Sequence, residues 1–202
     1  MLGLPKSTEL SKQLPKKAIY AKFNMNTAAK EKFDADISKI AIVAEISTST
    51  TAIAKGETVS SIYVLLVSLK RKDFDEKTIA GLSKLIDQNI LFVLDFDGKR
   101  KLAVCHGKLM QGEWTSPEDL IIPLKGLNFD AVWQNIIVQI GEVRIEQGKT
   151  LDEQLAVDEK RAKLQKEIDR LEKLARAERQ PKKKLELVQR ETAIKKEMDS
   201  LS

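Results

Sequence analysis

The chain has 202 residues and a net charge of +5, with 42% hydrophobic, 32% charged and only 5% aromatic residues. This balance is typical of one globular domain with a charged extension rather than of two full domains. A single cysteine, Cys105, excludes an intramolecular disulfide and a multi-cysteine zinc site. No apolar run approaches the ~20 residues of a membrane helix, and residues 1–5 lack the layout of a signal peptide. We therefore expect a cytoplasmic protein.

Residues 1–21 use an apolar–proline–basic pattern twice, at residues 4–6 and 14–17. Proline fixes φ and biases the preceding residue towards extended geometry, so we expect an arm with a short helix or turn between the prolines. The arm is interpreted either as a structural strap whose leucines pack on the core or as a basic segment that reaches for phosphate.

The first elements of the core are predicted from capping residues and apolar spacing. Asn26 or Thr27 can cap a helix that runs to about Ile37. An apolar run predicts a strand over residues 39–46. The serine- and threonine-rich residues 47–58 predict a mobile loop, with at most a short strand at residues 52–54.

A β-α-β-β unit between Ser61 and Leu109 is the predicted centre of the fold. Its strands are near-continuous apolar runs, which is typical of strands that are covered on both faces. Asp97-Gly98 predicts a tight hairpin turn, because both of its central residues must adopt positive φ. The predicted elements are a strand at residues 61–69, a helix at 73–88, a strand at 89–96 and a returning strand at 101–106.

The segment after this unit is predicted to finish the core. Turn residues lie between Gly107 and Pro123, and we expect a short edge strand over residues 120–124. Asn128 caps a predicted helix from Phe129 to about Gly141, whose apolar stripe should pack on a face of the sheet.

From about Thr150 the composition changes, because aromatic residues and glycine vanish while charged residues, leucine and alanine dominate. Apolar residues follow a 3-4 spacing that Arg161 and Glu191 each interrupt once. Pro181 separates two helical arms. This pattern predicts an antiparallel coiled-coil hairpin with its tip at about residues 178–183; pairing of the arms with another subunit is the alternative.

The hairpin tip is the most suggestive chemical feature, because basic side chains there outnumber acidic ones. Such a tip can neutralise phosphates without reading sequence. The alternatives are a solvated coiled-coil surface or a surface for a protein partner. The candidate residues for nucleic-acid or partner binding are Arg176, Arg179, Lys182, Lys183 and Lys184.

A metal-dependent nuclease is a second hypothesis. Restriction-type nuclease cores place an acid–x–lysine on a strand that precedes a helix, and Lys70 ends a suitable strand here. Ser68 stands where the acid is needed, while Glu45 and Glu57 lack the required spacing. Without these carboxylates nothing holds Mg²⁺ at the scissile phosphate, so an inactive nuclease-like fold is the form that we keep as an alternative.

Two other pairs of polar residues are interpreted as structural. Cys105 and His106 are adjacent on a strand, so their side chains point to opposite faces, which is wrong for a Cys–His catalytic pair. Asp95 and Asp97 could hold a divalent metal, but such a pair more often flanks a hairpin turn. We predict no catalytic residue, no metal site and no cofactor.

Short motifs lie at residues 4–8, 14–17, 89–98, 112–114, 124–133 and 180–187. Together they resemble the bacterial domain of unknown function 4391 family over nearly the whole chain. The resemblance implies accessory proteins encoded beside adenine-specific DNA methyltransferases and helicases of restriction-like defence systems. It implies no established active site. It also implies that relatives often have an acidic residue at the position of Ser68, so this chain departs from the family there.

Together these observations predict an α/β (α+β) protein: a mixed β-sheet with flanking helices, followed by a C-terminal helical hairpin. The expected parts are a basic Leu-Pro-Lys arm (1–21), an α/β core domain (22–147) and a coiled-coil hairpin (148–202). The leading hypothesis is a non-enzymatic accessory protein of a bacterial DNA restriction or defence system. It would bind a helicase or methyltransferase partner, with DNA as a further candidate ligand. A purely structural coiled-coil homodimer is the third hypothesis.

Overall fold

The computed structural model describes residues 2–201 and divides the chain into two compact units, residues 1–142 and 143–202. The first unit holds a six-stranded mixed β-sheet and its helices, and the second is a helical hairpin, so the predicted fold class is confirmed. Within the described residues, no helix is both long and apolar enough to cross a membrane.

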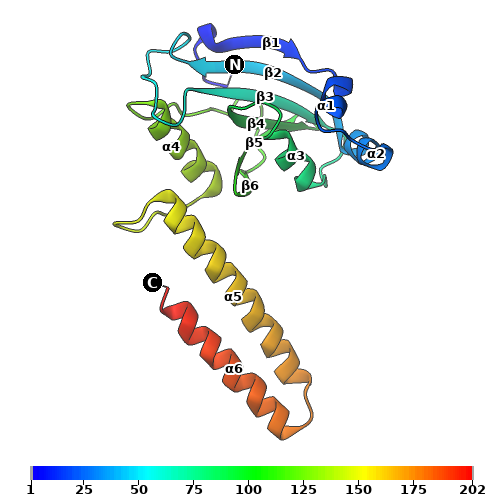
Figure 1. Cartoon of the computed structure of the whole chain (residues 1–202), viewed down its shortest axis with the longest axis vertical. Helices are drawn as coiled ribbons and strands as arrows, with labels where there is room; N and C mark the ends of the chain where they lie inside the picture. The colour runs from blue at the N-terminus through cyan, green and yellow to red at the C-terminus, as the bar shows by residue number, and fades with distance from the viewer. Residues whose placement is uncertain (1, 202) are drawn as a thin grey trace. The chain divides into compact units, whose positions relative to one another are not determined.

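The strands of the sheet lie side by side in their order along the chain, β1 to β6 (Figure 1). Only β3 and β4 are parallel; every other neighbouring pair is antiparallel. A parallel pair needs a crossover, and here α3 provides it. The strands are β1 (Glu9–Gln13), β2 (Ile37–Ser47), β3 (Ser61–Leu69), β4 (Asn89–Phe96), β5 (Lys99–His106) and β6 (Lys108–Gln111).

Helices α1 (Lys16–Lys22), α2 (Thr27–Asp36) and α3 (Glu76–Leu82) contribute to one hydrophobic core with β2 to β5. Asn26 caps α2 as predicted, since its side chain accepts a hydrogen bond from the backbone of Ala29. Helix α4 (Phe129–Gly141) has the predicted bounds and packs on β5 and β6. Its apolar stripe is buried: Phe129, Val132, Ile136, Ile137 and Ile140.

Strands β3 and β4 have the bounds predicted for them, and the predicted hairpin turn is confirmed by positive φ at Asp97 and Gly98, 50° and 72°. The helix predicted at residues 73–88 is too long, because α3 ends at Leu82. The Ser83 hydroxyl donates to the carbonyl oxygen of Ala80 at 2.7 Å, and residues 83–88 continue as turns and bends. Apolar residues beyond Leu82 reach the core from a turn, which is why their spacing mimicked a helix.

The edge strand predicted at residues 120–124 is wrong. This segment is extended without strand pairing, although Leu120 and Ile122 are buried and the amide of Ile122 donates to the carbonyl of Leu2 at 3.0 Å. The actual edge strands are β6 and β1. Strand β1 lies in the segment predicted as an arm, where it pairs with β2.

The serine- and threonine-rich loop before β3 is tied to the N-terminus of α4. The carboxylate of Asp130 accepts hydrogen bonds from the amides of Glu57 at 2.7 Å and Val59 at 2.8 Å. It also accepts from the Thr58 hydroxyl at 2.7 Å. A Cβ on Gly56 would lie 2.4 Å from this carboxylate, so only glycine fits there. The short strand considered at residues 52–54 is a single bridge, Ala54 to Asn128.

Helices α5 (Leu151–Ala177) and α6 (Pro181–Asp199) form the hairpin of the second unit, in antiparallel contact within one chain. Ion pairs link the helices, Lys195 to Glu172 at 3.2 Å and Lys160 to Glu197 at 2.9 Å. The turn between the helices covers residues 178–180. It lies within the tip predicted at about residues 178–183, whose last three residues already belong to α6.

Candidate functional site

The ends of the two hairpin helices follow directly from their sequence. Thr150 and Glu153 form a capping box, in which each side chain binds the backbone of the other residue at the start of α5. The hydrogen bond that the backbone N–H of Thr150 donates to the Glu153 carboxylate is the main cause of the lowered pKa of Glu153. Pro181 is the first residue of α6, a position where its missing N–H is not needed. Proline therefore starts the second helix here instead of breaking one.

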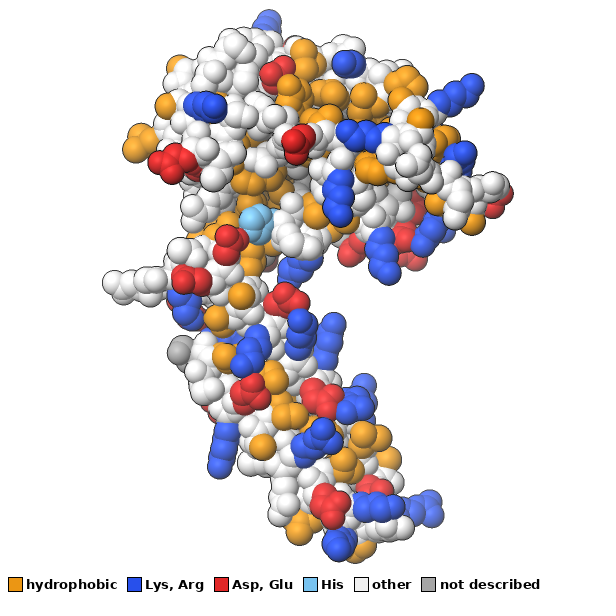
Figure 2. Space-filling view, viewed as in Figure 1, with side chains coloured by type: hydrophobic (Ala, Val, Ile, Leu, Met, Phe, Trp, Pro, Cys, Tyr) orange, Lys and Arg blue, Asp and Glu red, His pale blue; other side chains and the backbone are white. Residues whose placement is uncertain are grey.

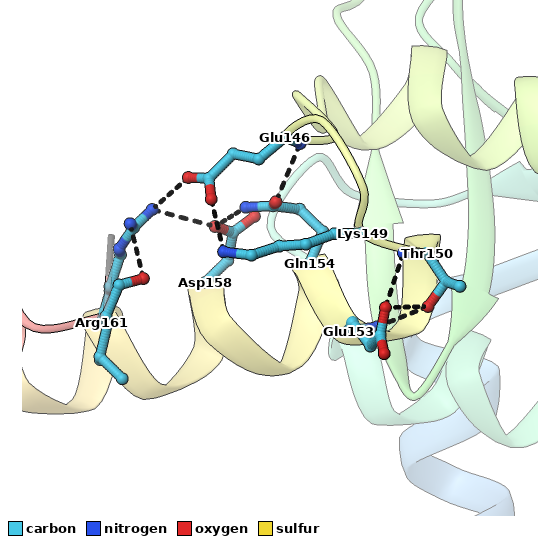
Figure 3. Close-up of polar contacts among 8 residues, drawn as sticks. Glu146, Lys149, Thr150, Glu153, Gln154, Asp158 and Arg161 are labelled. Atoms are coloured by element: carbon cyan, nitrogen blue, oxygen red, sulfur yellow. Dashed lines mark hydrogen bonds and ion pairs between the residues drawn. The ribbon is translucent and has the colours of Figure 1, made fainter.

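A polar network closes the base of the hairpin (Figure 3). Arg161, which interrupts the apolar repeat, binds Glu146 at 3.2 Å and the carbonyl of Leu201 at 3.0 Å. A hydrogen bond from Lys149, and then one from Arg161, lowers the pKa of Glu146. The Gln154 side chain is buried; its oxygen accepts from the amide of Glu146 at 3.1 Å and its nitrogen donates to Asp158 at 2.9 Å. The polar groups at the base are thus paired with one another.

In the middle of the hairpin, the buried residues all belong to α5. On α5, Ile168 and Leu171 are each 1% exposed and Ala175 is 5% exposed. Helix α6 has 19 residues, and none of them is buried. Amphipathic helices gain most of their stability from packing an apolar face. The surface of α6 is therefore incompletely covered by its own chain.

The segment 170–190, called the basic end below, carries the surplus positive charge of the protein. It contains eight basic and three acidic residues, a surplus equal to the net charge of +5 for the whole chain. All five predicted contact residues are exposed there. Arg176 makes a loose ion pair with Glu172, 3.7 Å long. Within residues 2–201, no ion-pair partner is seen for the side chains of Arg179, Lys182, Lys183 and Lys184.

Apolar side chains are exposed at the same end of the hairpin. Leu174 is 46%, Leu185 58% and Val188 41% exposed. Figure 2 shows hydrophobic side chains beside lysine and arginine at this end. None of these three residues is among the contact residues predicted from the sequence. The sequence holds one indication of this surface. Leu185 and Val188 are three residues apart, which places them on the same side of α6, one position away from the main apolar repeat.

The three residues considered for a nuclease site are not brought together. Glu45 pairs with Tyr63 near the start of β3, and Glu57 precedes that strand. Lys70 follows the other end of β3, about 20 Å away at ~3.3 Å per strand residue. A carboxylate and a lysine that act on one phosphate must be close together, so these residues do not form an active site.

Asp36, which was not among the predicted site residues, ends α2 next to Lys70, the residue that follows β3. Its side chain is fully buried and accepts from Nε of Arg71 at 2.5 Å and from the amide of Asp75 at 2.9 Å. The backbone carbonyl of Asp36 accepts from the amide of Lys70 at 2.8 Å. These bonds tie the loop after β3 to the end of α2. Because the carboxylate is fully engaged, its arrangement is that of a structural anchor.

The other polar pairs have structural surroundings. Asp95 forms an ion pair with Arg100 at 3.0 Å, and Asp97 lies in the hairpin turn. Cys105 and His106 pair with Leu109 and Lys108 of β6, at successive positions of β5. In the part of the chain that the structure describes, no group of three or more His, Cys, Asp or Glu residues could hold a metal ion.

Comparison with known proteins places the chain by family and not by activity. A family model described as Domain of unknown function (DUF4391) matches residues 2–198. No curated protein and no solved structure matches the chain significantly. The match includes both the sheet unit and nearly all of the hairpin. The chain belongs to the DUF4391 family, a family of domains of unknown function.

Proposed function

We propose that this protein is a non-enzymatic accessory protein of a bacterial DNA restriction or defence system, and that its hairpin binds a protein partner. The partner class, a DNA methyltransferase or a helicase, comes from the family resemblance. One observation carries the proposal: apolar side chains are exposed among unpaired cations at the basic end. Protein interfaces combine an apolar centre with a polar rim in this way.

The chemistry of the basic end indicates what the partner surface should contain. Leu174, Leu185 and Val188 offer an apolar contact, and burial of such side chains stabilises a complex by about 25 cal/mol per Å². The surrounding positive charge favours a partner with acidic residues around an apolar strip. A second copy of the same end is disfavoured, because the two surfaces would repel each other.

Co-purification would test the proposal. The tagged chain is co-expressed with a DNA methyltransferase and, separately, with a helicase of a bacterial restriction system. A variant with Leu185→Ser and Val188→Ser should lose roughly tenfold or more in affinity, which corresponds to ~1.4 kcal/mol. Reversal of Arg179, Lys182 and Lys183 to glutamate should slow association and remove its salt dependence.

The matched control reverses Lys12, Lys17 and Lys22, three exposed lysines of the first unit. This variant has the same change in net charge and should bind the partner as the unaltered chain does. Equal loss in both charge variants would contradict a role for the basic end. If the unaltered chain binds neither the methyltransferase nor the helicase, the proposal is contradicted as well.

A second candidate function is duplex-DNA binding, favoured by the unpaired cations themselves. Anisotropy of labelled duplex across a salt series would measure it, with the full chain and the Arg179, Lys182 and Lys183 reversal. If these cations neutralise phosphates, the log–log salt slope should change by about 0.9 per lost contact. Absence of binding at low salt would leave the protein partner as the function of this end.

A further inference from the structure

Lys101 of β5 is a buried lysine without a hydrogen-bond acceptor. It is only 9% exposed, and no described residue accepts a hydrogen bond from its ammonium or forms an ion pair with it. Its Nζ instead lies 4.6 Å from the ring centroid of Trp114 and 5.3 Å from that of Phe74. Burial lowers the pKa of Lys101. The stem of the side chain is buried, whereas the Nζ atom still reaches solvent, where water or a ligand can accept its hydrogen bonds.

A second polar group without a partner lies on the neighbouring strand. The side-chain oxygen Oε1 of Gln111 is buried and accepts no hydrogen bond from residues 2–201. Nε2 of the same amide donates to Glu76 at 2.6 Å. Only the nitrogen can donate to a carboxylate, so this contact fixes the orientation of the amide and leaves the enclosed oxygen as an acceptor that the described residues do not use.

The sheet register places these two groups on one face. Gln111 is paired with Ala103 across β5 and β6, and Lys101 is two residues before Ala103. Side chains two residues apart in a strand share a face. Lys101 and Gln111 are therefore diagonal neighbours, with Cβ atoms about 7 Å apart. A donor that contacts aromatic rings alone and an acceptor without a described donor are thus neighbours.

Aromatic side chains surround this pair. The rings of Phe96 and Trp114 contact each other edge to face, with centroids 6.4 Å apart and planes at 61°. Phe74, Phe96 and Trp114 are all only partly buried. Partly exposed aromatic rings on a sheet are the surfaces on which nucleobases stack.

The local charges favour a neutral ligand at the lysine. Glu76 and Glu113 are close enough to raise the pKa of Lys101, which partly opposes the effect of burial. Their carboxylates would repel an anion at the same place. The exposed Lys72 and Lys99 lie in the loop after β3 and at the start of β5. They could meet phosphate groups that stay in solvent.

We propose that Lys101, Gln111 and Trp114 form a binding site for an unpaired nucleobase of single-stranded nucleic acid. The base would accept a hydrogen bond from Lys101, donate one to Oε1 of Gln111 and stack on an aromatic ring. Every nucleobase carries a donor and an acceptor on one edge of a flat ring. This site belongs to the first unit and takes a different ligand from the basic end, so it goes beyond the function proposed above.

Tryptophan fluorescence of the full chain would test the site. The chain has two tryptophans, Trp114 and Trp133, and Trp133 lies in α4. The Trp133→Phe variant therefore makes Trp114 the only emitter. Single-stranded DNA and RNA 12-mers should quench this emission to saturation. An abasic 12-mer with the same phosphates, and a duplex, should bind at least about fivefold more weakly, since a stacked base contributes ~1–3 kcal/mol.

Variants then assign the contact. Lys101→Met and Gln111→Met, each in the Trp133→Phe background, should weaken oligonucleotide binding at least about fivefold. Lys108→Met, on the exposed edge of β6, should leave it unchanged. Circular dichroism checks that each variant is folded. The abasic comparison needs no change in the cluster, so it decides the question even if a variant fails to fold.

Three results would overturn the proposal. They are no quenching by any 12-mer, equal affinity for the abasic strand, and loss of binding in the Arg179, Lys182 and Lys183 reversal with the cluster intact. The first result would mean that Lys101, Gln111 and Trp114 only stabilise the packing of the first unit. The others would assign the binding to phosphate charge alone. None of them bears on whether a protein partner binds the hairpin.

Discussion

Strand β3 and helix α6 show two different uses of apolar residues in one chain. In β3, five of nine residues are buried, and the strand has neighbours on both sides in the sheet. In α6, none of 19 residues is buried, although the helix carries leucine, valine, isoleucine and methionine. Burial in β3 stabilises the fold. The apolar residues of α6 are still partly available to another molecule.

This difference indicates that most of the buried core lies in the first unit, whereas the surface for which we propose a protein partner lies on the hairpin. Regions with few buried apolar contacts open at lower free energy than a packed core. Both tryptophans lie in the first unit, so their fluorescence follows that unit alone. Far-ultraviolet circular dichroism also follows the helices of the hairpin. The two signals together allow the comparison to be tested.

The largest expected effect is in the core of the sheet. Phe92 of β4 is fully buried, so Phe92→Ala should destabilise the first unit by about 3–5 kcal/mol. Urea unfolding followed by tryptophan fluorescence would measure the change. Val188→Ala in α6 is the contrasting variant and should leave this transition unmoved. A large shift with Val188→Ala would show that the hairpin supports the core.

The next effect concerns the buried anchor between α2 and the loop after β3. Asp36→Asn keeps the size of the side chain but removes the charge that Arg71 and the Asp75 amide bind. We expect a loss of about 2 kcal/mol in the same fluorescence transition. Asp73→Asn, an exposed neighbour, should stay within about 0.5 kcal/mol. Equal effects of the two changes would contradict the anchor.

A smaller effect is expected at the start of the hairpin. Thr150→Ala removes the capping box of α5 and should destabilise that helix by about 1 kcal/mol. Hydrogen exchange of the first turns of α5 would report it, while the fluorescence transition stays unchanged. Thr192→Ala, an exposed position within α6, removes no cap and serves as the control. Slower exchange in Thr150→Ala would exclude the capping role.

The smallest effect, which is present at neutral pH and disappears in acid, is expected at Asp130. The Thr58 hydroxyl, followed by three backbone amides, lowers the pKa of Asp130. A lowered folded pKa means that this stabilisation is present above the unfolded value of about 4 and is lost as pH falls through the folded value. Melting temperatures between pH 7 and pH 3 should therefore fall less steeply for Asp130→Asn than for the unaltered chain. Parallel curves would contradict this assignment.

Much of the fold could be predicted because its signals are local. The bounds of β3 and β4 follow from long apolar runs, α4 from an apolar stripe and the Asn128 cap, and the β4–β5 turn from Asp97-Gly98. The errors arose where burial did not require regular structure. Leu120 and Ile122 alternate as in a strand, but they pack without a strand partner.

The candidate sites depend on contacts between distant residues, which sequence spacing does not reveal. The charge of the basic end is visible in sequence because its residues are consecutive. The exposure of Leu185 is not visible, since it depends on how α6 packs on α5. Likewise, Lys101 becomes unusual only when β6 brings Gln111 beside it and the following segment brings Trp114 over it.

The order of the sheet has a consequence for how the protein is made. Each strand pairs with the strand that precedes it in the chain, from β1 to β6. During synthesis, a new strand thus finds its partner already formed as it leaves the ribosome, and no strand must wait for a distant one. The bond between Ile122 and Leu2 is different, because it joins residues that are far apart in the sequence of the first unit. This contact can form only after all six strands have been synthesised.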